Sequence, residues 1–300
     1  MNKKIHGKAI RYTASDKIFL TITYTVLACF LIVIAYPLLF VISASFSAGA
    51  TTMTLSLIPK RFSLAGYQAV FQYQDIWTGY GNSLIYMVLG TVISLVLTVL
   101  MAYPLSRPDF KAGRFIMVLC MITMYFSGGL IPTYLVVRQL KLVNTRWAVI
   151  LPGAMSVYNM IVTRTYFKTS IPGELFESGQ LDGCGNIRYL ISIVLPLSGP
   201  ILAVIGLFYA VGYWNAYFDA MIYLSGKREL YPLSLILREI LVLNNANIDM
   251  LDIETLMAME ERRNVMKYAV IVVSSLPVMI LYPFVQRYFV KGVMIGAVKG

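Results

Sequence analysis

Charged residues are scarce in this chain. Of its 300 residues, only 13% are Asp, Glu, Lys or Arg, which is about half the share of a typical soluble domain. Hydrophobic residues make up 58%, which leaves too few polar residues to cover a soluble fold of this length. A soluble enzyme, a secreted domain and a nucleic-acid-binding protein are therefore excluded as main interpretations, and the outer surface is expected to face lipid.

Histidine and cysteine are also nearly absent. The single histidine, His6, lies in the charged N-terminus, and the cysteines are Cys29, Cys120 and Cys184. No pair among them suggests a disulfide or a metal site, so we expect no bound metal and assign no catalytic residue. A membrane-embedded enzyme would need a nucleophile with its base, or metal ligands, within the apolar segments, and the sequence does not supply them.

The few charges divide the chain into long apolar runs. Six uncharged stretches contain 42, 31, 23, 17, 30 and 19 residues, and about 20 mostly apolar residues cross a bilayer as a helix. The sequence therefore predicts an all-α polytopic membrane protein, a single domain over residues 1–300 with six transmembrane helices. The predicted spans are 18–42, 83–103, 115–137, 147–167, 190–217 and 268–289.

Lysine and arginine indicate the orientation. Residues 1–17 contain five of them, and the apolar run that follows is too long for the core of a signal peptide, so we expect it to be retained. With this end inside, cytoplasmic segments hold 14 Lys and Arg and outer segments hold 11, as the positive-inside rule favours. Both termini are thus predicted to be cytoplasmic, with an outer loop over 219–267.

Charge is missing from the interior of the predicted spans as well. Ion-coupled secondary transporters usually keep ionisable residues there, and they are often built from repeated halves. Neither feature is visible in this sequence. An ion-coupled secondary transporter is therefore kept only as the alternative interpretation. Transport driven by an external source of energy, ATP, is favoured.

A polar segment, 172–185, interrupts the apolar pattern between the fourth and fifth predicted spans. Glu174 and Glu177 lie near the start of a predicted short helix, where negative charge suits the helix dipole. Asp182 and Gly183 are typical of a turn, and Gly183 is expected to need a backbone conformation that a Cβ would penalise. Taken alone, the segment could be an ordinary amphipathic helix at the membrane surface.

The spacing in this segment resembles the EAA loop of the membrane subunits of ABC importers. In that loop Glu-Ala-Ala is followed by three residues, Gly, nine residues and Ile-x-Leu-Pro. Here Glu177, Ser178 and Gly179 stand at the first three positions, Gly183 follows after three residues, and nine more lead to Ile-Val-Leu-Pro at 193–196. Both alanines are replaced by small residues, which leaves the details of packing open.

Further segments resemble the carbohydrate permeases of the maltose type, in the branch for complex oligosaccharides or polysaccharides. They are Leu-Asp-Gly-Cys at 181–184, and residues 128–153, 213–237 and 283–300. The resemblance covers about residues 18–300. It implies the type I ABC importer permease fold, and a non-catalytic subunit that moves a sugar, oligosaccharide or polysaccharide by alternating access. The loop alone would also allow an ABC permease for a non-sugar solute.

The resemblance also implies a location and a set of partners. The location is the plasma or inner membrane of a prokaryote, with membrane lipid around the chain. The chain has no Walker-type phosphate loop, so two copies of a cytoplasmic ATPase would bind ATP and Mg²⁺, and no cofactor is expected in this chain. A second permease subunit, expected to be a different chain, and an extracellular or periplasmic solute-binding protein complete the set. No nucleic-acid partner is expected.

Two sets of residues are implied to contact the ATPase. The helix over 172–185 would dock on it and couple hydrolysis to the spans. The coupling candidates are Leu175, Phe176, Glu177, Ser178, Gly179, Asp182 and Gly183. The C-terminal tail, with Lys291, Gly296 and Lys299, would reach between the ATPase subunits.

Aromatic and polar side chains in the spans are candidates for the sugar path. Sugars stack their apolar faces on aromatic rings and bond their hydroxyls to polar groups. Because Tyr and Trp also anchor proteins at membrane interfaces, anchoring is the alternative role. The candidates are Tyr125, Tyr158, Asn159, Tyr209, Tyr213, Trp214, Asn215 and Tyr217.

Overall fold

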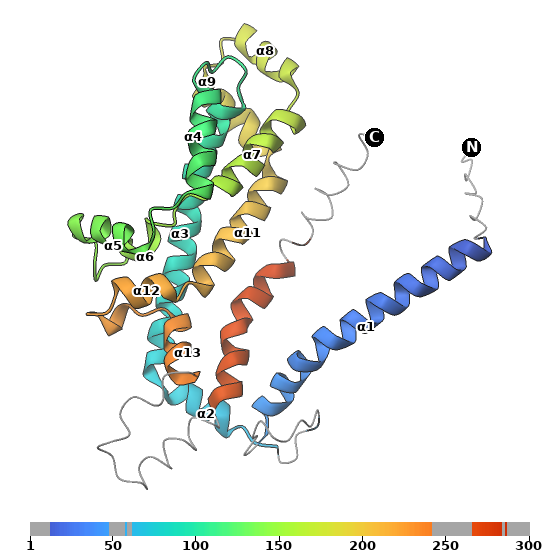
Figure 1. Ribbon diagram of the computed structural model, residues 1–300, viewed down its shortest axis with the longest axis vertical. Helices are drawn as coiled ribbons and strands as arrows, with labels where there is room; N and C mark the ends of the chain where they lie inside the picture. The colour runs from blue at the N-terminus through green and yellow to red at the C-terminus, as the bar shows by residue number, and fades with distance from the viewer. Residues whose placement is uncertain (1–12, 48–57, 59–61, 242–265, 284–285, 287–300) are drawn as a thin grey trace.

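The structure, a computed structural model, describes residues 13–47, 58, 62–241, 266–283 and 286. Regular structure within these residues is helical apart from one isolated bridge between Ser47 and Phe62, which confirms the predicted all-α class. The longest helix, α3 (Gln74–Ser106), runs through the bundle beside α7 (Val157–Ser170) and α11 (Gly199–Asn215) (Figure 1).

Short helices cap both ends of this bundle. One end carries α8 and α9, and the other carries α2 and α13 (Figure 1). The shorter elements are α2 (Ala65–Gln72), α4 (Gly113–Tyr125), α5 (Leu130–Gln139), α6 (Trp147–Ile150), α8 (Gly173–Leu181), α9 (Asn186–Tyr189), the π-helix η1 (Leu190–Val194), α10 (Leu195–Leu197), α12 (Phe218–Tyr223), the 3-10 helix η2 (Arg228–Leu230) and α13 (Leu233–Leu241).

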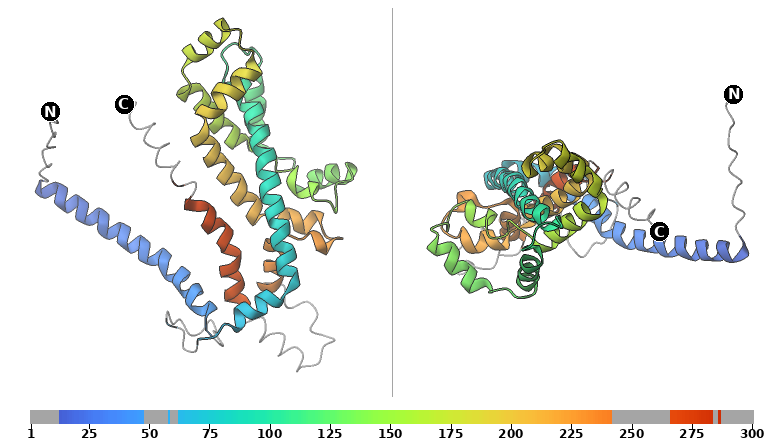
Figure 2. Two further views of the ribbon diagram at one scale, coloured as in Figure 1. Left: turned by 180° about the vertical axis from the view of Figure 1, so that it is seen from behind. Right: turned by 90° about the horizontal axis from the view of Figure 1, so that it is seen from above.

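The first helix, α1 (Ala14–Ser45), contains the predicted span 18–42 but stands apart from the bundle (Figure 2). It begins with a capping box: the Asp16 N–H donates to the Thr13 hydroxyl, and the Thr13 N–H donates to the Asp16 carboxylate. The hydrogen bonds from Thr13 hold the pKa of the Asp16 carboxyl below its usual value. Near its other end, Phe40 meets Tyr268 of helix 266–283 edge-on, with 5.8 Å between ring centres.

Small residues on one face of α3 let the neighbouring helices approach closely. Ser83, Gly90, Ser94 and Thr98 are all buried and recur every four or seven residues, which places them on one side of a helix. Gly90 lies directly against the ring of Tyr213 on α11. Close approach at small residues is the usual basis of helix packing in membranes. The helix α3 is therefore the central helix, against which α7, α11 and α13 pack.

Three of the predicted spans are not straight helices, which corrects the sequence prediction. Residues 115–137 divide into α4 and α5, bent by 113°, and residues 190–217 lie in a pair of segments bent by 83° after Leu197. Residues 147–167 divide into α6, a non-helical stretch over 151–156, and α7.

Glycine and proline explain these breaks. Gly129, between α4 and α5, has φ +86°, a conformation that a helix does not contain. Pro152 and Gly153 lie in the non-helical stretch before α7, and Pro196 and Pro200 flank the bend near Ser198. Proline removes a helical hydrogen bond and clashes with the preceding turn. Charge-free runs locate apolar segments, but they do not show where such a segment is broken.

The predicted count of six spans is not confirmed. By length and composition, three helices among the described residues can cross a bilayer, or five if each bent pair counts as one span. The range 147–167 is missing from that set, because α7 has 14 residues and reaches only about 21 Å at 1.5 Å per residue. The sixth predicted range coincides with helix 266–283 as far as residue 283, and the predicted outer loop contains α13 and much of α12.

We predict that Gly90→Ala destabilises the fold. An added Cβ would lie 2.5 Å from the Tyr213 ring, and hydrogen bonds from Ser94 and to Ile150 fix that ring. Overpacking typically costs about 1–3 kcal/mol, so the melting temperature of the purified complex should fall. Gly212→Ala is the matched control, because it adds a Cβ to α11 with no neighbour within 4 Å. Equal melting temperatures for the two variants would contradict the prediction.

Candidate functional site

The helix α8 has a defined end. The Gly183 N–H donates to the Gln180 carbonyl (3.0 Å), and the Cys184 N–H donates to the Gly179 carbonyl (2.8 Å). These two bonds form the Schellman motif, which needs a residue of positive φ after the helix. Gly183 has φ +72°, so the expectation that it needs a conformation unfavourable for a Cβ is confirmed.

One face of α8 is held by side chains of its own chain. The guanidinium carbon of Arg107, at the end of α3, lies 3.1 Å from the centre of the Phe176 ring. Tyr189 of α9 meets the same ring edge-on at 5.2 Å, and Gly179 is buried against Tyr189, where an added Cβ would lie 3.3 Å away. The Arg107 side chain is only 15% exposed. Cation–π contacts strengthen when they are desolvated, so α8 is tied firmly to α3 and α9.

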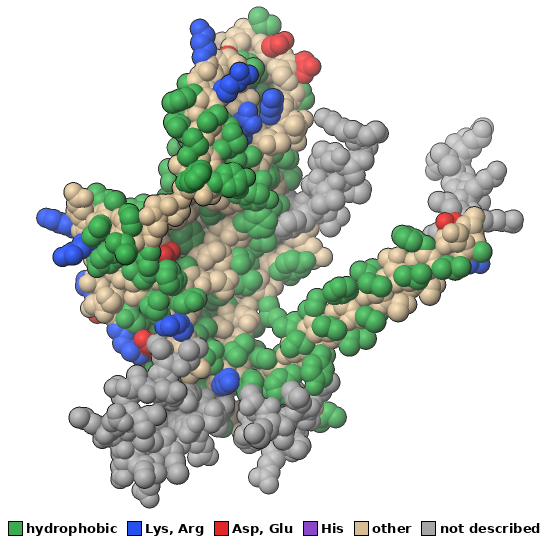
Figure 3. Space-filling model, in the orientation of Figure 1, with side chains coloured by type: hydrophobic (Ala, Val, Ile, Leu, Met, Phe, Trp, Pro, Cys, Tyr) green, Lys and Arg blue, Asp and Glu red, His purple; other side chains and the backbone are tan. Residues whose placement is uncertain are grey.

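The opposite face of α8 is exposed and mixes apolar and acidic side chains. Leu181 is 90% exposed and Leu175 is 39% exposed, while Glu177, Ser178 and Asp182 are exposed beside them. Figure 3 shows carboxylates at this end of the molecule, with Lys and Arg side chains nearby. Of the seven coupling candidates, Phe176 and Gly179 thus face their own chain, and the other five are open to a partner.

The chain between α8 and α11 departs from regular α-helix. Leu190–Val194 form a π-helix, a rare element that is frequent at functional sites. Pro196 comes next, and the bend follows at Ser198, whose buried hydroxyl has no hydrogen-bond partner within the described parts of the chain. The segment from α8 to α11 is therefore interrupted by a π-helix and a bend of 83°.

Two of the sugar-path candidates, Tyr209 and Tyr213, are buried and committed to hydrogen bonds. The Tyr209 hydroxyl bonds Thr98 (2.7 Å) and accepts from the Ser156 N–H (3.1 Å). The Tyr213 hydroxyl bonds Ser94 (3.1 Å) and donates to the Ile150 carbonyl (3.0 Å). These bonds satisfy backbone groups on both sides of the break between α6 and α7, so the two tyrosines hold that break against α3.

Trp214 and Asn215, in contrast, line a cavity of about 270 Å³ between α11, α13 and helix 266–283. The Trp214 indole N–H donates to the Ser274 carbonyl (3.2 Å). The hydroxyl residues Ser234, Ser274 and Ser275 also line the cavity. An aromatic ring, an amide and several hydroxyls are the groups that sugar sites use.

The other path candidates do not line this cavity. Tyr125 is 79% exposed and Tyr158 is 57% exposed. Asn159 is buried in α7, and the Tyr217 ring lies 5.8 Å from the guanidinium carbon of Arg238. The structure thus separates the eight candidates instead of bringing them together. The tail residues Lys291, Gly296 and Lys299 lie outside the described residues.

No protein-family model matches the sequence. The chain is 39% identical over 288 residues to the polygalacturonan/rhamnogalacturonan transport system permease protein YtcP of Bacillus subtilis (strain 168), a match that covers 95% of this chain and 99% of that protein. The chain belongs to the permease subunits of carbohydrate ABC importers. The permease is also 30% identical to the arabinooligosaccharides transport system permease protein AraQ of Halalkalibacterium halodurans, over 88% of this chain and 91% of that one.

A solved structure agrees with this assignment. The permease superposes with a TM-score of 0.83 on a chain of a bacterial ABC transporter involved in the import of the acidic polysaccharide alginate, with 33% identity, and the match covers 94% of this chain and 100% of that chain. As a member of this family, the permease is a non-catalytic multi-pass subunit in the inner membrane. ABC importers of this kind also comprise a partner permease, an ATPase and a solute-binding protein.

Sequence reasoning missed several residues that shape the permease around α8 and the break before α7. Arg107 and Tyr189 hold α8, and Ser94 and Thr98 hold the two tyrosines. Phe176 and Arg107 are 69 positions apart, and no local pattern signals a contact over that distance. The only available signal was that Arg107 ends an uncharged run at the same membrane face as the EAA loop.

We predict that Arg107→Gln loosens α8. The substitution removes the cation from the face of Phe176, at a cost of about 0.5–2 kcal/mol. Amide hydrogen exchange across residues 173–181 should therefore accelerate severalfold in the purified complex. Lys111→Gln removes a charge at the same end without touching Phe176 and should leave the exchange unchanged. Unchanged exchange in both variants would show that other contacts hold α8.

Proposed function

We propose that the permease is one of two membrane subunits of an ATP-driven oligosaccharide importer, and that α8 is the helix through which it is driven. ATP and Mg²⁺ are bound by two copies of a separate ATPase. The observation that carries this proposal is the division of α8 into two faces. Phe176 and Gly179 attach it to its own chain, while Leu175, Glu177 and Leu181 remain exposed to a partner.

The attachment of α8 suits the transmission of movement. A displacement of α8 reaches α3 through Arg107 and Phe176, and it reaches α11 along the chain through α9, the π-helix and α10. We infer that α11 changes its angle at the bend of 83° after Leu197. Alternating access needs such a change of helix angle, coupled to the closing of the ATPase.

The proposed role of α8 also assigns the orientation. The α8 end of the bundle lies in the cytoplasm, and the α13 end lies outside. Both termini are proposed to be cytoplasmic, and α1 runs toward the α2 end of the bundle, away from the α8 end (Figure 2). The tail residues Lys291, Gly296 and Lys299 remain a proposed contact with the ATPase subunits. The solute-binding protein would dock at the outer end.

The substrate is proposed to be an oligosaccharide that contains uronic acids. Support comes from two relatives, the polygalacturonan/rhamnogalacturonan permease and the alginate importer. The cavity beside Trp214 and Asn215 is the proposed point of contact with the sugar. Tyr209 and Tyr213 contribute indirectly, since their hydroxyls are occupied within the fold.

Two substitutions in α8 should disconnect the ATPase. Gly183→Val forces a β-branched residue into positive φ, which costs at least about 1–2 kcal/mol, and it should misplace the turn after α8. Glu177→Lys reverses a charge-assisted contact at a cost of roughly 1–3 kcal/mol, or about a five- to hundredfold loss of ATPase affinity. Pull-down of the ATPase by membrane complexes, together with sugar-stimulated hydrolysis, measures both effects.

Matched controls separate coupling from general damage. Gly185→Val adds the same side chain two residues later, where φ is −71° and no atom lies within 4 Å of the new Cβ. Glu229→Lys makes the same charge change at the opposite end of the bundle. Both controls should recruit the ATPase normally. Wild-type recruitment by Gly183→Val and Glu177→Lys would refute the coupling role of α8 and the orientation that depends on it.

A substrate panel tests the sugar class. In proteoliposomes that contain the complete importer and its binding protein, oligogalacturonate should stimulate hydrolysis and be taken up in preference to maltotriose and arabino-oligosaccharide. Trp214→Ala should lower uptake about two- to tenfold, because an aromatic contact is worth about 0.5–1.5 kcal/mol beyond its area. Tyr125→Ala, in an exposed position, is the control. Preference for a neutral sugar would overturn the proposed class, and normal uptake by Trp214→Ala would refute the proposed contact.

A further inference from the structure

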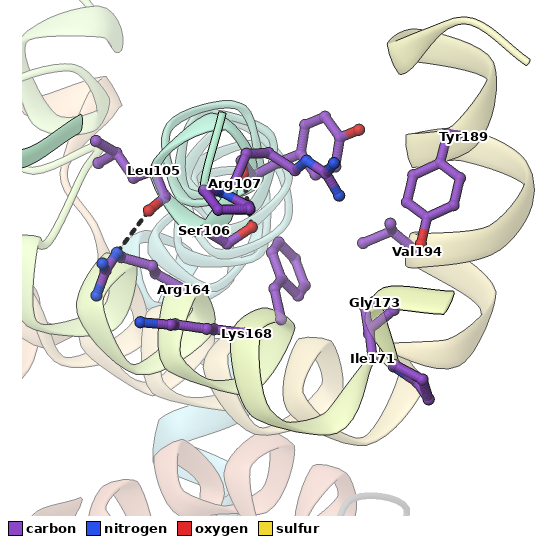
Figure 4. A pocket seen from close by; sticks show the side chains of 13 residues that line it. Leu105, Ser106, Arg107, Arg164, Lys168, Ile171, Gly173, Tyr189 and Val194 are labelled. Atoms are coloured by element: carbon purple, nitrogen blue, oxygen red, sulfur yellow. Dashed lines mark hydrogen bonds between the residues drawn. The ribbon is translucent and has the colours of Figure 1, made fainter. Parts of the chain in front are cut away.

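A basic pocket lies between the end of α3, α7 and the start of α8. It has a volume of about 320 Å³ and is lined by Arg107, Arg164 and Lys168 together with Ser106 (Figure 4). We propose that this pocket binds the phosphate of an anionic phospholipid. The inference goes beyond the transport role, and it rests on the proposed function only for the assignment of the cytoplasmic leaflet.

The cations of this pocket are held in place but poorly neutralised. The Arg164 Nε donates to the Leu105 carbonyl (2.7 Å), which fixes the guanidinium while its terminal nitrogens stay available. Lys168 lies one turn further along α7, and its side chain extends in the same direction as that of Arg164 (Figure 4). Within the described part of the chain, Arg164 and Lys168 form no salt bridge. Arg107, in contrast, forms one with Asp109, with 3.3 Å between its Nε and the Asp109 Oδ1.

This charge arrangement selects the chemistry of the ligand. No acidic residue lines the pocket, so an occupant must bring its own negative charge. A planar guanidinium binds phosphate through paired hydrogen bonds, and an ammonium adds a point charge. The Ser106 hydroxyl in the wall already donates to the Tyr103 carbonyl (2.6 Å), so the donors for a phosphate come from the basic side chains. A phosphate ester therefore fits the available donors.

An apolar pocket adjoins the basic one and favours a lipid over a free phosphate. Its volume is about 350 Å³, and it shares Tyr103 and Arg107 with the basic pocket. Leu100, Ile187 and Leu190 line it, together with the polar residues Asp109 and Asn186. Leu100 lies seven residues before Arg107 on α3, which is about 10 Å along the helix axis toward the middle of the bundle. A molecule with a phosphate head and a hydrocarbon tail can fill both pockets, whereas inorganic phosphate can fill only the first.

The position of the pocket agrees with this assignment. It lies at the α8 end of the bundle, at the level where α3 and α7 end (Figure 1). Basic pockets between membrane helices on the cytoplasmic side are known to bind anionic headgroups. A lipid held here would contact α3, α7 and the start of α8 together, and would thus lie beside the proposed coupling helix.

Native mass spectrometry of the complete importer, titrated with dioleoyl phosphatidylglycerol, tests the proposal. Arg164→Gln combined with Lys168→Gln should weaken binding about thirtyfold, because each basic residue is worth about 1 kcal/mol near an anionic lipid and 1.4 kcal/mol is tenfold. Lys168→Gln alone, at an exposed position, should weaken it about fivefold on the same scale. Lys111→Gln combined with Arg114→Gln is the matched control and should leave the affinity unchanged.

Each other result decides against the proposal. Equal affinity in the wild type and the pocket variants would refute the site, and equal weakening in the control would show general surface attraction. Displacement of the lipid by inorganic phosphate would assign the pocket to free phosphate. If the pocket variants keep the lipid but lose the ATPase, the pocket receives an acidic group of the ATPase instead. The lipid titration does not depend on coupling, so normal ATPase recruitment by Gly183→Val would refute the role of α8 without affecting this result.

Discussion

In hydrocarbon, a backbone N–H or carbonyl that leaves a helix must find its partner within the protein. The fold depends on how this constraint is met at the break between α6 and α7. Tyr213 bonds the Ile150 carbonyl and Tyr209 bonds the Ser156 N–H. Tyr213 reaches its partner because Gly90 on α3 leaves room for its ring, and Thr98 on α3 bonds the Tyr209 hydroxyl. The break between α6 and α7 therefore depends on the small and hydroxyl residues of α3, through the two tyrosines.

The α8 end combines firm attachment with an open surface. The cation–π contact of Arg107 with Phe176 and the close packing of Gly179 on Tyr189 fix the inner face. Leu181 and Glu177 remain exposed on the outer face. The same Arg107 also lines both the basic pocket and the adjoining apolar one. A single side chain at the end of α3 thus belongs to both the helix attachment and the proposed lipid site.

The all-α class, the α8 segment and the positive φ of Gly183 could be predicted from the sequence, because they depend on composition and on local turn chemistry. The breaks at Gly129, Pro152 and Ser198 could not, since apolar length alone does not reveal how neighbouring helices satisfy a broken segment. The same limit applies to the sugar path. Tyr209, Tyr213 and Trp214 are equivalent candidates in the sequence. Of these three, Trp214 lines the cavity between α11, α13 and helix 266–283, because its neighbours come from the last two of these helices.

The length of α1 has a consequence for the surrounding membrane. Its 32 residues measure about 48 Å at 1.5 Å per residue, well beyond a hydrocarbon core of about 30 Å. Such mismatch is relieved by tilting or by local thickening of the bilayer. Because α1 meets helix 266–283 through Phe40 near its C-terminal end and slopes away toward its N-terminus (Figure 1), a tilt opens a wedge beside the bundle. Along α1, apolar side chains such as Phe30, Leu31 and Val33 are exposed, so acyl chains or the helices of a second subunit must cover them.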